Sequence, residues 1–155
     1  MQVSKILFPT DFSTTCQAAL ELATTLARDT KAKLLIVHVE EPPAVYSEGA
    51  LYYGLTEPDR AALWRMLAEV VPTDPTVPYE HRLIVGAPAS SILYLAEKEG
   101  ADLIVMPTHG RTGMTRLLMG SVAEEVVRKA KCPVLTIKST ASPAGTGSRP
   151  TEKLP

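Results

Sequence analysis

The chain has 155 residues, of which 45% are hydrophobic and 21% charged, and its formal net charge is −1. These values are typical of one globular domain with a single core, and a charge so close to zero excludes a general attraction for nucleic acid or an acidic membrane. The sequence has no apolar run of about 18 residues and does not begin with a signal-peptide pattern, so we expect a cytoplasmic protein.

The first part of the chain predicts a strand, a helix and a second strand. The short apolar run at 5–10 predicts the first strand. Apolar residues then recur at helical spacing over 13–30, and Ser13 is the expected N-cap of that helix. The almost continuous apolar run from Lys33 to Glu40 is typical of a strand buried on both faces, as in a parallel sheet.

A segment rich in Pro, Gly and Tyr follows at 40–55 and is predicted to be a loop. Its three tyrosines could cover a ligand or contact a partner, and the sequence leaves both possibilities open. They are Tyr46, Tyr52 and Tyr53. A helix is expected next, with Thr56 as its N-cap and Asp59 at its third helical position.

The second half of the chain continues the alternation of strands and helices. The predicted elements are a strand at 79–86, a helix at 87–100, a strand at 101–107, a helix at 121–130 and a strand at 132–138. In the helix at 87–100, Ile92, Leu95 and Ala96 should face inward, and Gly100 should end the helix. This order predicts an α/β fold, a parallel sheet with helices on both faces. Residues 139–155, rich in Ser, Thr, Pro and Gly, are expected to form a flexible tail.

Ligands of open parallel sheets bind beyond the carboxyl ends of the strands, where the strand order reverses. If the order is 3-2-1-4-5, the first and fourth strands flank that point. The segment at 106–121, MPTHGRTGMTRLLMGS, would then lie beside Asp11.

Three features of this segment suit a phosphate group. Its glycines allow close approach of the backbone and positive φ; they are Gly110, Gly113 and Gly120. The helix that begins at Ser121 offers unpaired N–H groups and the positive end of its dipole. Arg111 and Arg116 add positive charge. The alternative is purely structural, because Ser121 and Glu124 also form an S-x-x-E capping box that would only start the helix.

Other polar residues admit two interpretations each. Asp11 could contact a sugar hydroxyl or a metal, or could simply stabilise a turn. His38 is interpreted as a core residue, whereas His109 could contact phosphate or water. Cys16 and Cys132 lack metal-binding or redox spacing and are interpreted as inert thiols. No nucleophile–base or paired-carboxylate pattern indicates catalysis, so the pattern favours binding over chemistry.

Four stretches resemble the universal stress protein (UspA-like) family, namely ILFPTDFS, LIVHV, VGAPASSIL and the block from DLIVMPTHG to PVLTIK. The resemblance covers 1–138. It implies a three-layer, doubly wound sheet of five parallel strands in the order 3-2-1-4-5, the adenine nucleotide alpha hydrolase-like fold. It also implies a homodimer formed through the last strand, and a stress-response sensor or adaptor whose protein partner the sequence does not identify.

ATP-binding members of the family carry the motif G-x-x-G-x9-G-S/T after the fourth strand. Gly110, Gly120 and Ser121 match it, whereas Pro107 replaces the first glycine and so lacks a backbone N–H. The resemblance implies a site for ATP, ADP or AMP, with Mg²⁺ at the phosphates and no metal ligands from the protein. It implies that Asp11 contacts the ribose and that Val39 contacts the adenine through its backbone. The complete set of implied nucleotide-binding residues is Pro9, Thr10, Asp11, Val39, Met106, Pro107, Gly110, Arg111, Gly120, Ser121 and Val122.

Two alternatives remain within the resemblance. One is a member that binds no nucleotide and acts as an interaction protein. The other is a slow ATP hydrolase or an autophosphorylating protein.

Overall fold

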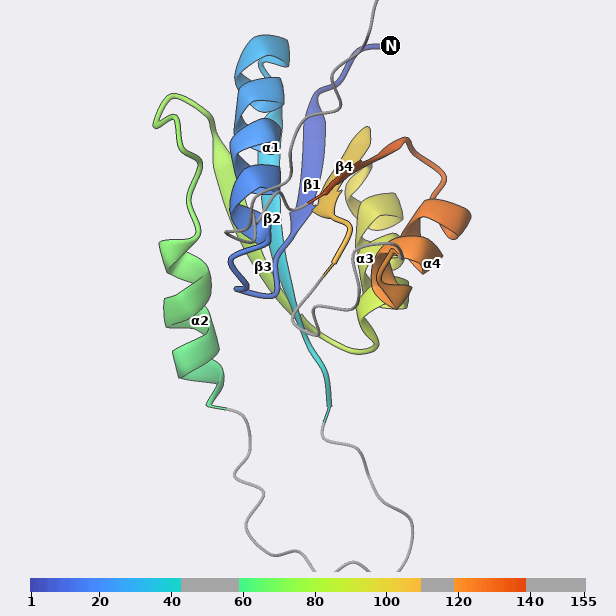
Figure 1. Cartoon of the computed structure of the whole chain (residues 1–155). Helices are drawn as coiled ribbons and strands as arrows, with labels where there is room; N and C mark the ends of the chain where they lie inside the picture. Colours follow the sequence, from blue (N-terminus) through green and yellow to red (C-terminus); the bar gives the residue numbers. More distant parts are fainter. Residues whose placement is uncertain (43–58, 110–118, 139–155) are drawn as a thin grey trace, which may run out of the picture.

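The computed structural model of the chain describes residues 1–42, 59–109 and 119–138. Strands and helices alternate along these residues as predicted (Figure 1). The strands are β1 (Lys5–Pro9), β2 (Lys33–Glu40), β3 (Tyr79–Val85), β4 (Leu103–Pro107) and β5 (Val134–Ile137). The helices are α1 (Cys16–Thr30), α2 (Arg60–Glu69), α3 (Pro88–Glu99) and α4 (Ser121–Lys129).

Several predictions made from the sequence concern residues outside the described part of the chain. They are those for Tyr46, Tyr52, Tyr53, Thr56, Gly110, Arg111, Gly113, Arg116 and the tail at 139–155.

The five strands form one parallel sheet in the order β3-β2-β1-β4-β5, which confirms the expected topology. β1 pairs with β2 up to the pair Pro9↔Val37, and with β4 at Ile6↔Leu103 and Leu7↔Ile104. The chain moves outward from β1 in one direction through β2 and β3 and in the other through β4 and β5. The strand order therefore reverses between β1 and β4, where a ligand site is expected.

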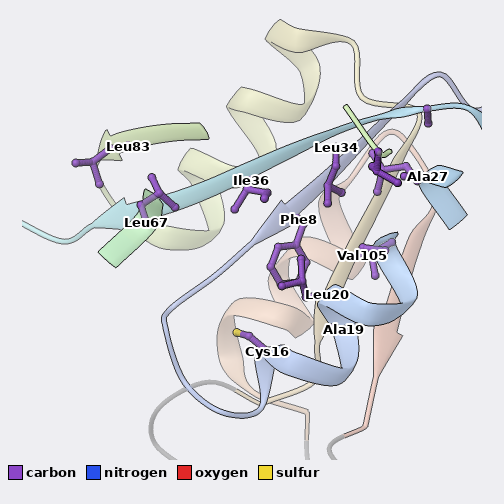
Figure 2. Close-up of a cluster of buried hydrophobic side chains, with 14 residues drawn as sticks. Phe8, Cys16, Ala19, Leu20, Ala27, Leu34, Ile36, Leu67, Leu83 and Val105 are labelled. Atoms are coloured by element: carbon purple, nitrogen blue, oxygen red, sulfur yellow. The ribbon is translucent and has the colours of Figure 1, made fainter. Parts of the chain in front are cut away.

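Helices cover both faces of the sheet, with α1 and α2 on one face and α3 and α4 on the other (Figure 1). The side chains of β2 alternate between the two cores. Leu34 and Ile36 pack toward α1 and α2, and Leu35 and Val37 pack toward α3 and α4. Figure 2 shows the first of these clusters, in which Phe8 lies among side chains of α1. Burial on both faces explains why the sequence of β2 is almost wholly apolar.

The first helix starts later than the sequence suggested, and Ser13 is not its N-cap. α1 begins at Cys16, with no side-chain hydrogen bond at its N-cap. Ser13 belongs to the preceding turn, where its backbone N–H donates to Oδ1 of Asp11 at 2.9 Å. The turn also places Phe12 in the left-handed region, with φ of 65°. The residues between β1 and α1 therefore build a specific turn instead of extending the helix.

The start of α2 differs from the prediction, whereas α4 begins at Ser121 as predicted. Asp59 is itself the N-cap of α2, and its side chain accepts a hydrogen bond from the N–H of Ala62 at 3.1 Å. Gly120, not Ser121, is the N-cap of α4, and the predicted capping box of Ser121 and Glu124 does not form. The end of α3 agrees with the prediction, because Gly100 adopts a left-handed conformation there. No helix in the described part of the chain is long and apolar enough to cross a bilayer.

Candidate functional site

A cleft of about 670 Å³ lies at the carboxyl ends of β1, β2 and β4 and at the start of α4. This volume is within the usual range for small-molecule sites. Every described residue of the predicted nucleotide-binding set lines it; these are Pro9, Thr10, Asp11, Val39, Met106, Pro107, Gly120, Ser121 and Val122. The fold therefore brings together residues that lie more than 100 positions apart in the sequence.

Asp11 is held in place by the turn that follows β1. Its Oδ1 accepts hydrogen bonds from the backbone N–H of Ser13 at 2.9 Å and from the thiol of Cys16 at 3.3 Å. The left-handed φ of Phe12, 65°, is uncommon for a bulky residue, and such strained residues concentrate at functional sites. The carboxyl group of Asp11 thus has a defined position in the lining of the cleft.

Burial raises the pKa of the Cys16 thiol and the negative charge of Asp11 adds to the rise, although a hydrogen bond with the backbone of Asp11 opposes it. Cys16 therefore stays protonated at neutral pH and remains a hydrogen-bond donor. It lines the cleft as a supporting residue for Asp11 and lacks the lowered pKa of a nucleophilic cysteine.

The backbone of Val39 faces the cleft because β2 continues beyond the end of β1. The last bond between the two strands joins the N–H of Thr10 to the carbonyl of Val37 at 2.8 Å. Backbone groups of alternate residues point to the same neighbouring strand, so the N–H and C=O of Val39 also point toward the β1 side. At that level β1 has already ended at Pro9. These groups are therefore directed at the space where a ligand would lie.

His38 is a buried, hydrogen-bonded histidine, as the sequence suggested. Its Nδ1 donates to the carbonyl of Thr10 at 2.8 Å, and its ring lies 4.2 Å from the ring of Phe12, centroid to centroid. His38 also lines the cleft, which the sequence interpretation did not include. Its contacts link the end of β2 to the turn that carries Asp11.

Pro107 ends β4 at a position where a missing N–H costs little. The N–H of Thr108 donates to the carbonyl of Ile137 in β5 at 2.9 Å, so the nitrogen of Pro107 faces β1. β1 and β4 pair at Ile6↔Leu103 and Leu7↔Ile104, which lie before Pro107 along β4. The proline therefore lies where the two strands part and the cleft opens.

The start of α4 forms the opposite wall of the cleft. The N–H of Gly120 donates to the carbonyl of Thr108 at 2.8 Å, which ties the helix start to the end of β4. Gly120 has φ of −62°, so the expected positive φ is wrong for this glycine. Close approach is its actual role, because an added Cβ would lie 3.1 Å from the carbonyl oxygen of Thr108.

The first turn of α4 suits an anion. Ser121, Val122 and Ala123 line the cleft, and no side chain of the described residues caps this helix. The first N–H groups of a helix have no partner within the helix, and together with the helix dipole they attract negative charge.

Comparison with known proteins decides which family this arrangement represents. The family model described as the universal stress protein family matches residues 2–138. The chain belongs to the universal stress protein family. Universal stress protein MJ0531 of Methanocaldococcus jannaschii is 36% identical over 140 residues, which cover 86% of this chain and 81% of that protein.

Two solved structures extend the comparison. That of protein MJ0577 from the same organism has a TM-score of 0.69 and 32% identity, and covers 92% of this chain and 100% of its own. A universal stress protein solved in complex with cAMP has a TM-score of 0.66 and 25% identity, and covers 90% of this chain and 100% of its own.

The described lining of this universal stress protein cleft contains acidic residues but neither Lys nor Arg. The acidic residues are Asp11, Glu40 and Glu41. Among the described residues, attraction for an anion therefore comes mainly from backbone N–H groups and the dipole of α4. No group of three or more His, Cys, Asp or Glu side chains suited to a metal occurs among the described residues.

Some lining residues were absent from the predicted nucleotide-binding set. Glu40 ends β2, and the strand-end rule could have identified it. Pro88 and Ile92 line the cleft from the start of α3, which lies within the stretch VGAPASSIL that carried the family resemblance. Leu63 comes from α2, and nothing in the sequence indicated that α2 reaches the cleft.

Proposed function

We propose that the cleft binds an adenine nucleotide, ATP or its products ADP and AMP, and that the protein acts as a sensor or adaptor in the stress response. One observation carries the proposal. Three kinds of polar group occur in order across the cleft: the backbone of Val39 on β2, the carboxyl group of Asp11 after β1, and the N-terminus of α4 beyond β4.

This order suits the parts of a nucleotide. Backbone N–H and C=O groups at Val39 can pair with the edge of a base. A carboxyl group at Asp11 accepts hydrogen bonds from sugar hydroxyls, and the first turn of α4 accommodates phosphate. Adjacent strands lie about 4.8 Å apart, so β2 and β4 are separated by about 10 Å, a distance comparable with that from a base to its phosphates.

Mg²⁺ would accompany the triphosphate rather than occupy a protein site. Mg²⁺ is commonly held by phosphate oxygens, water and only one or two carboxylates. The described residues lack a larger ligand set, and Asp11 is the acidic residue nearest the proposed middle of the nucleotide. Mg²⁺ would neutralise phosphate charge that this acidic lining does not offset.

The relative solved with cAMP supports an adenine nucleotide as the ligand. Binding is favoured over catalysis because the cleft offers no activated nucleophile among its described residues, and burial raises the pKa of the Cys16 thiol. A bound nucleotide would then alter the surface that a protein partner recognises.

The direct test is to identify what the purified protein carries and binds. Mass spectrometry of small molecules released on denaturation should detect an adenine nucleotide, and calorimetry with ATP, ADP and AMP should yield a dissociation constant. At a nucleotide concentration of 100 times that constant, binding should add about 2.7 kcal/mol to the free energy of unfolding. Absence of both bound nucleotide and binding heat would instead support the interaction protein that binds none.

Matched variants locate the site. Asp11→Ala should weaken ATP binding because it removes the proposed ribose contact. Asp29→Ala makes the same charge change at an exposed position at the end of α1, outside the cleft lining, and should leave affinity unchanged. Equal affinities for both variants would contradict the proposed location.

Release of phosphate above that of a boiled control would support the slow hydrolase.

A further inference from the structure

One acidic oxygen in the cleft lacks a hydrogen-bond partner among the described residues. Oε2 of Glu40 is buried, and no described residue bonds to it. The backbone carbonyl of Glu40, by contrast, accepts a hydrogen bond from the N–H of Gly86 at 3.0 Å. A buried polar oxygen without a partner is costly, and native proteins seldom keep one without a reason. A ligand that donates a hydrogen bond would remove this cost.

The location of Glu40 indicates which part of a ligand it would meet. It is the last residue of β2 and follows Val39 directly. Side chains of alternate strand residues share a face, so Glu40 lies on the same face as Ile36 and His38, toward α1 and α2. Leu63 of α2 lines the cleft on that side. α4 is on the other face, so Glu40 belongs to the end of the cleft remote from the proposed phosphate site.

We propose that Glu40 selects nucleobases that carry an exocyclic amino group by accepting a hydrogen bond from that group. This inference rests on the proposed nucleotide binding. A carboxylate oxygen can only accept, whereas ring nitrogens, base carbonyls and phosphates also accept and would face it unfavourably. The 6-amino group of adenine is the donor that this end of the cleft would meet. Val39 would contact the edge of the base, and Glu40 would distinguish one base from another.

The test compares ATP with purine riboside triphosphate, which lacks only the 6-amino group. A hydrogen bond to a charged acceptor corresponds to about a ten- to hundredfold difference in affinity, so the wild-type protein should prefer ATP by that factor. Glu40→Met retains an unbranched side chain without an acceptor, and its preference should fall close to one. Glu69→Met makes the same change at an exposed position at the end of α2, outside the cleft lining, and should retain the wild-type preference.

Folding is checked by thermal unfolding without nucleotide. Glu40→Met should melt no lower than wild type, because it removes an unpartnered buried oxygen. If Glu40→Met does not fold, Glu40→Gln is tested in its place. The neutral amide carbonyl of glutamine accepts a weaker hydrogen bond than a carboxylate, so the preference for ATP should fall only in part.

The outcomes separate the two proposals. A Glu40 variant that binds ATP with the full wild-type preference would overturn the role of Glu40 and leave nucleotide binding intact. Equal wild-type affinity for the two triphosphates would do the same, since both retain the ribose hydroxyls. Failure of the wild-type protein to bind either triphosphate would overturn nucleotide binding itself, and the selectivity with it.

Discussion

The thiol of Cys16 donates a hydrogen bond to Oδ1 of Asp11, with 3.3 Å between sulfur and oxygen. The first residue of α1 thereby helps to orient the carboxyl group of Asp11 in the turn after β1. The sequence indicated only that Cys16 is an inert thiol. Its second role, as a donor to a residue in the cleft, leads to the first two predictions.

Removal of the Cys16 donor should weaken nucleotide binding through Asp11. Cys16→Val retains the volume but not the donor, and should lower ATP affinity by about two- to tenfold, the value of one neutral hydrogen bond. Cys16→Ser retains a donor and should bind nearly as wild type does. Calorimetry on both variants measures the difference. Equal affinities would show that the thiol does not position Asp11.

The reactivity of the two thiols should differ in a way that nucleotide changes. Burial raises the pKa of Cys16 and of Cys132, so each forms less thiolate at a given pH than in the unfolded chain. Alkylation near pH 8 should therefore be slower in the folded protein than in urea, and slowest at the more deeply buried Cys16. ATP should slow the reaction of Cys16 further and leave that of Cys132 unchanged, as peptide mass spectrometry can measure. An equal effect of ATP on both thiols would argue against Cys16 lying at the binding site.

Gly120 should be essential for ATP binding because it lies close to the carbonyl group of Thr108. In Gly120→Ala, the new Cβ would crowd the carbonyl oxygen of Thr108 at 3.1 Å, which should cost about 1–2 kcal/mol of stability and displace the start of α4. ATP affinity should fall, and Gly120→Val should abolish binding while far-UV circular dichroism shows a folded protein.

Gly100→Ala is the matched control for Gly120→Ala. Gly100 has φ of 64° and an added Cβ would meet no atom within 4 Å, so alanine there should cost about 1 kcal/mol through backbone strain alone. It lies at the far end of α3 and should leave ATP affinity unchanged. A similar loss of affinity in both variants would mean that general destabilisation explains the effect of Gly120→Ala.

Pro107→Gly should separate affinity from stability. Glycine restores the first position of the family motif and supplies an N–H that faces the cleft side of β4, so ATP affinity should be equal or higher. Stability should fall by about 1 kcal/mol, because glycine gains more freedom in the unfolded chain. Calorimetry and thermal unfolding measure the two quantities. A large loss of affinity would show that the rigid proline is required at this site.

The last strand should form a homodimer interface. β5 is an edge of the sheet, Leu135 on it is 37% exposed, and exposed apolar edges favour pairing with another chain. We expect a dimer built on Val134, Leu135 and Ile137, with two-fold symmetry. Leu135→Lys should yield a monomer in light scattering, whereas Val127→Lys, exposed on α4, should not. A wild-type mass that stays monomeric at all concentrations would contradict the dimer.

The sequence predicted best those structural features that depend only on residues adjacent in the chain. β2 was predicted with its observed bounds, because burial on both faces leaves a continuous apolar run. The start of α1 was predicted wrongly and the capping box considered for Ser121 does not form, because both depend on contacts that local capping rules do not include. Asp11 draws Ser13 into a turn, and Thr108 binds the N–H of Gly120. The unpartnered oxygen of Glu40 likewise results from tertiary packing and leaves no pattern in the sequence.

β1 ends opposite Val37, whereas β2 continues through His38, Val39 and Glu40. Because β2 extends beyond β1, the site depends on whether an even or an odd number of residues is inserted in β2. One extra residue before His38 would turn the backbone groups now supplied by Val39 toward β3 and move the carboxyl group of Glu40 to the opposite face. Two extra residues would preserve both directions and shift the groups by about 6.6 Å along the strand. Variants that insert two residues in β2 can therefore deepen the cleft and keep its arrangement. Insertion of one residue would remove the backbone and carboxyl groups that face the base.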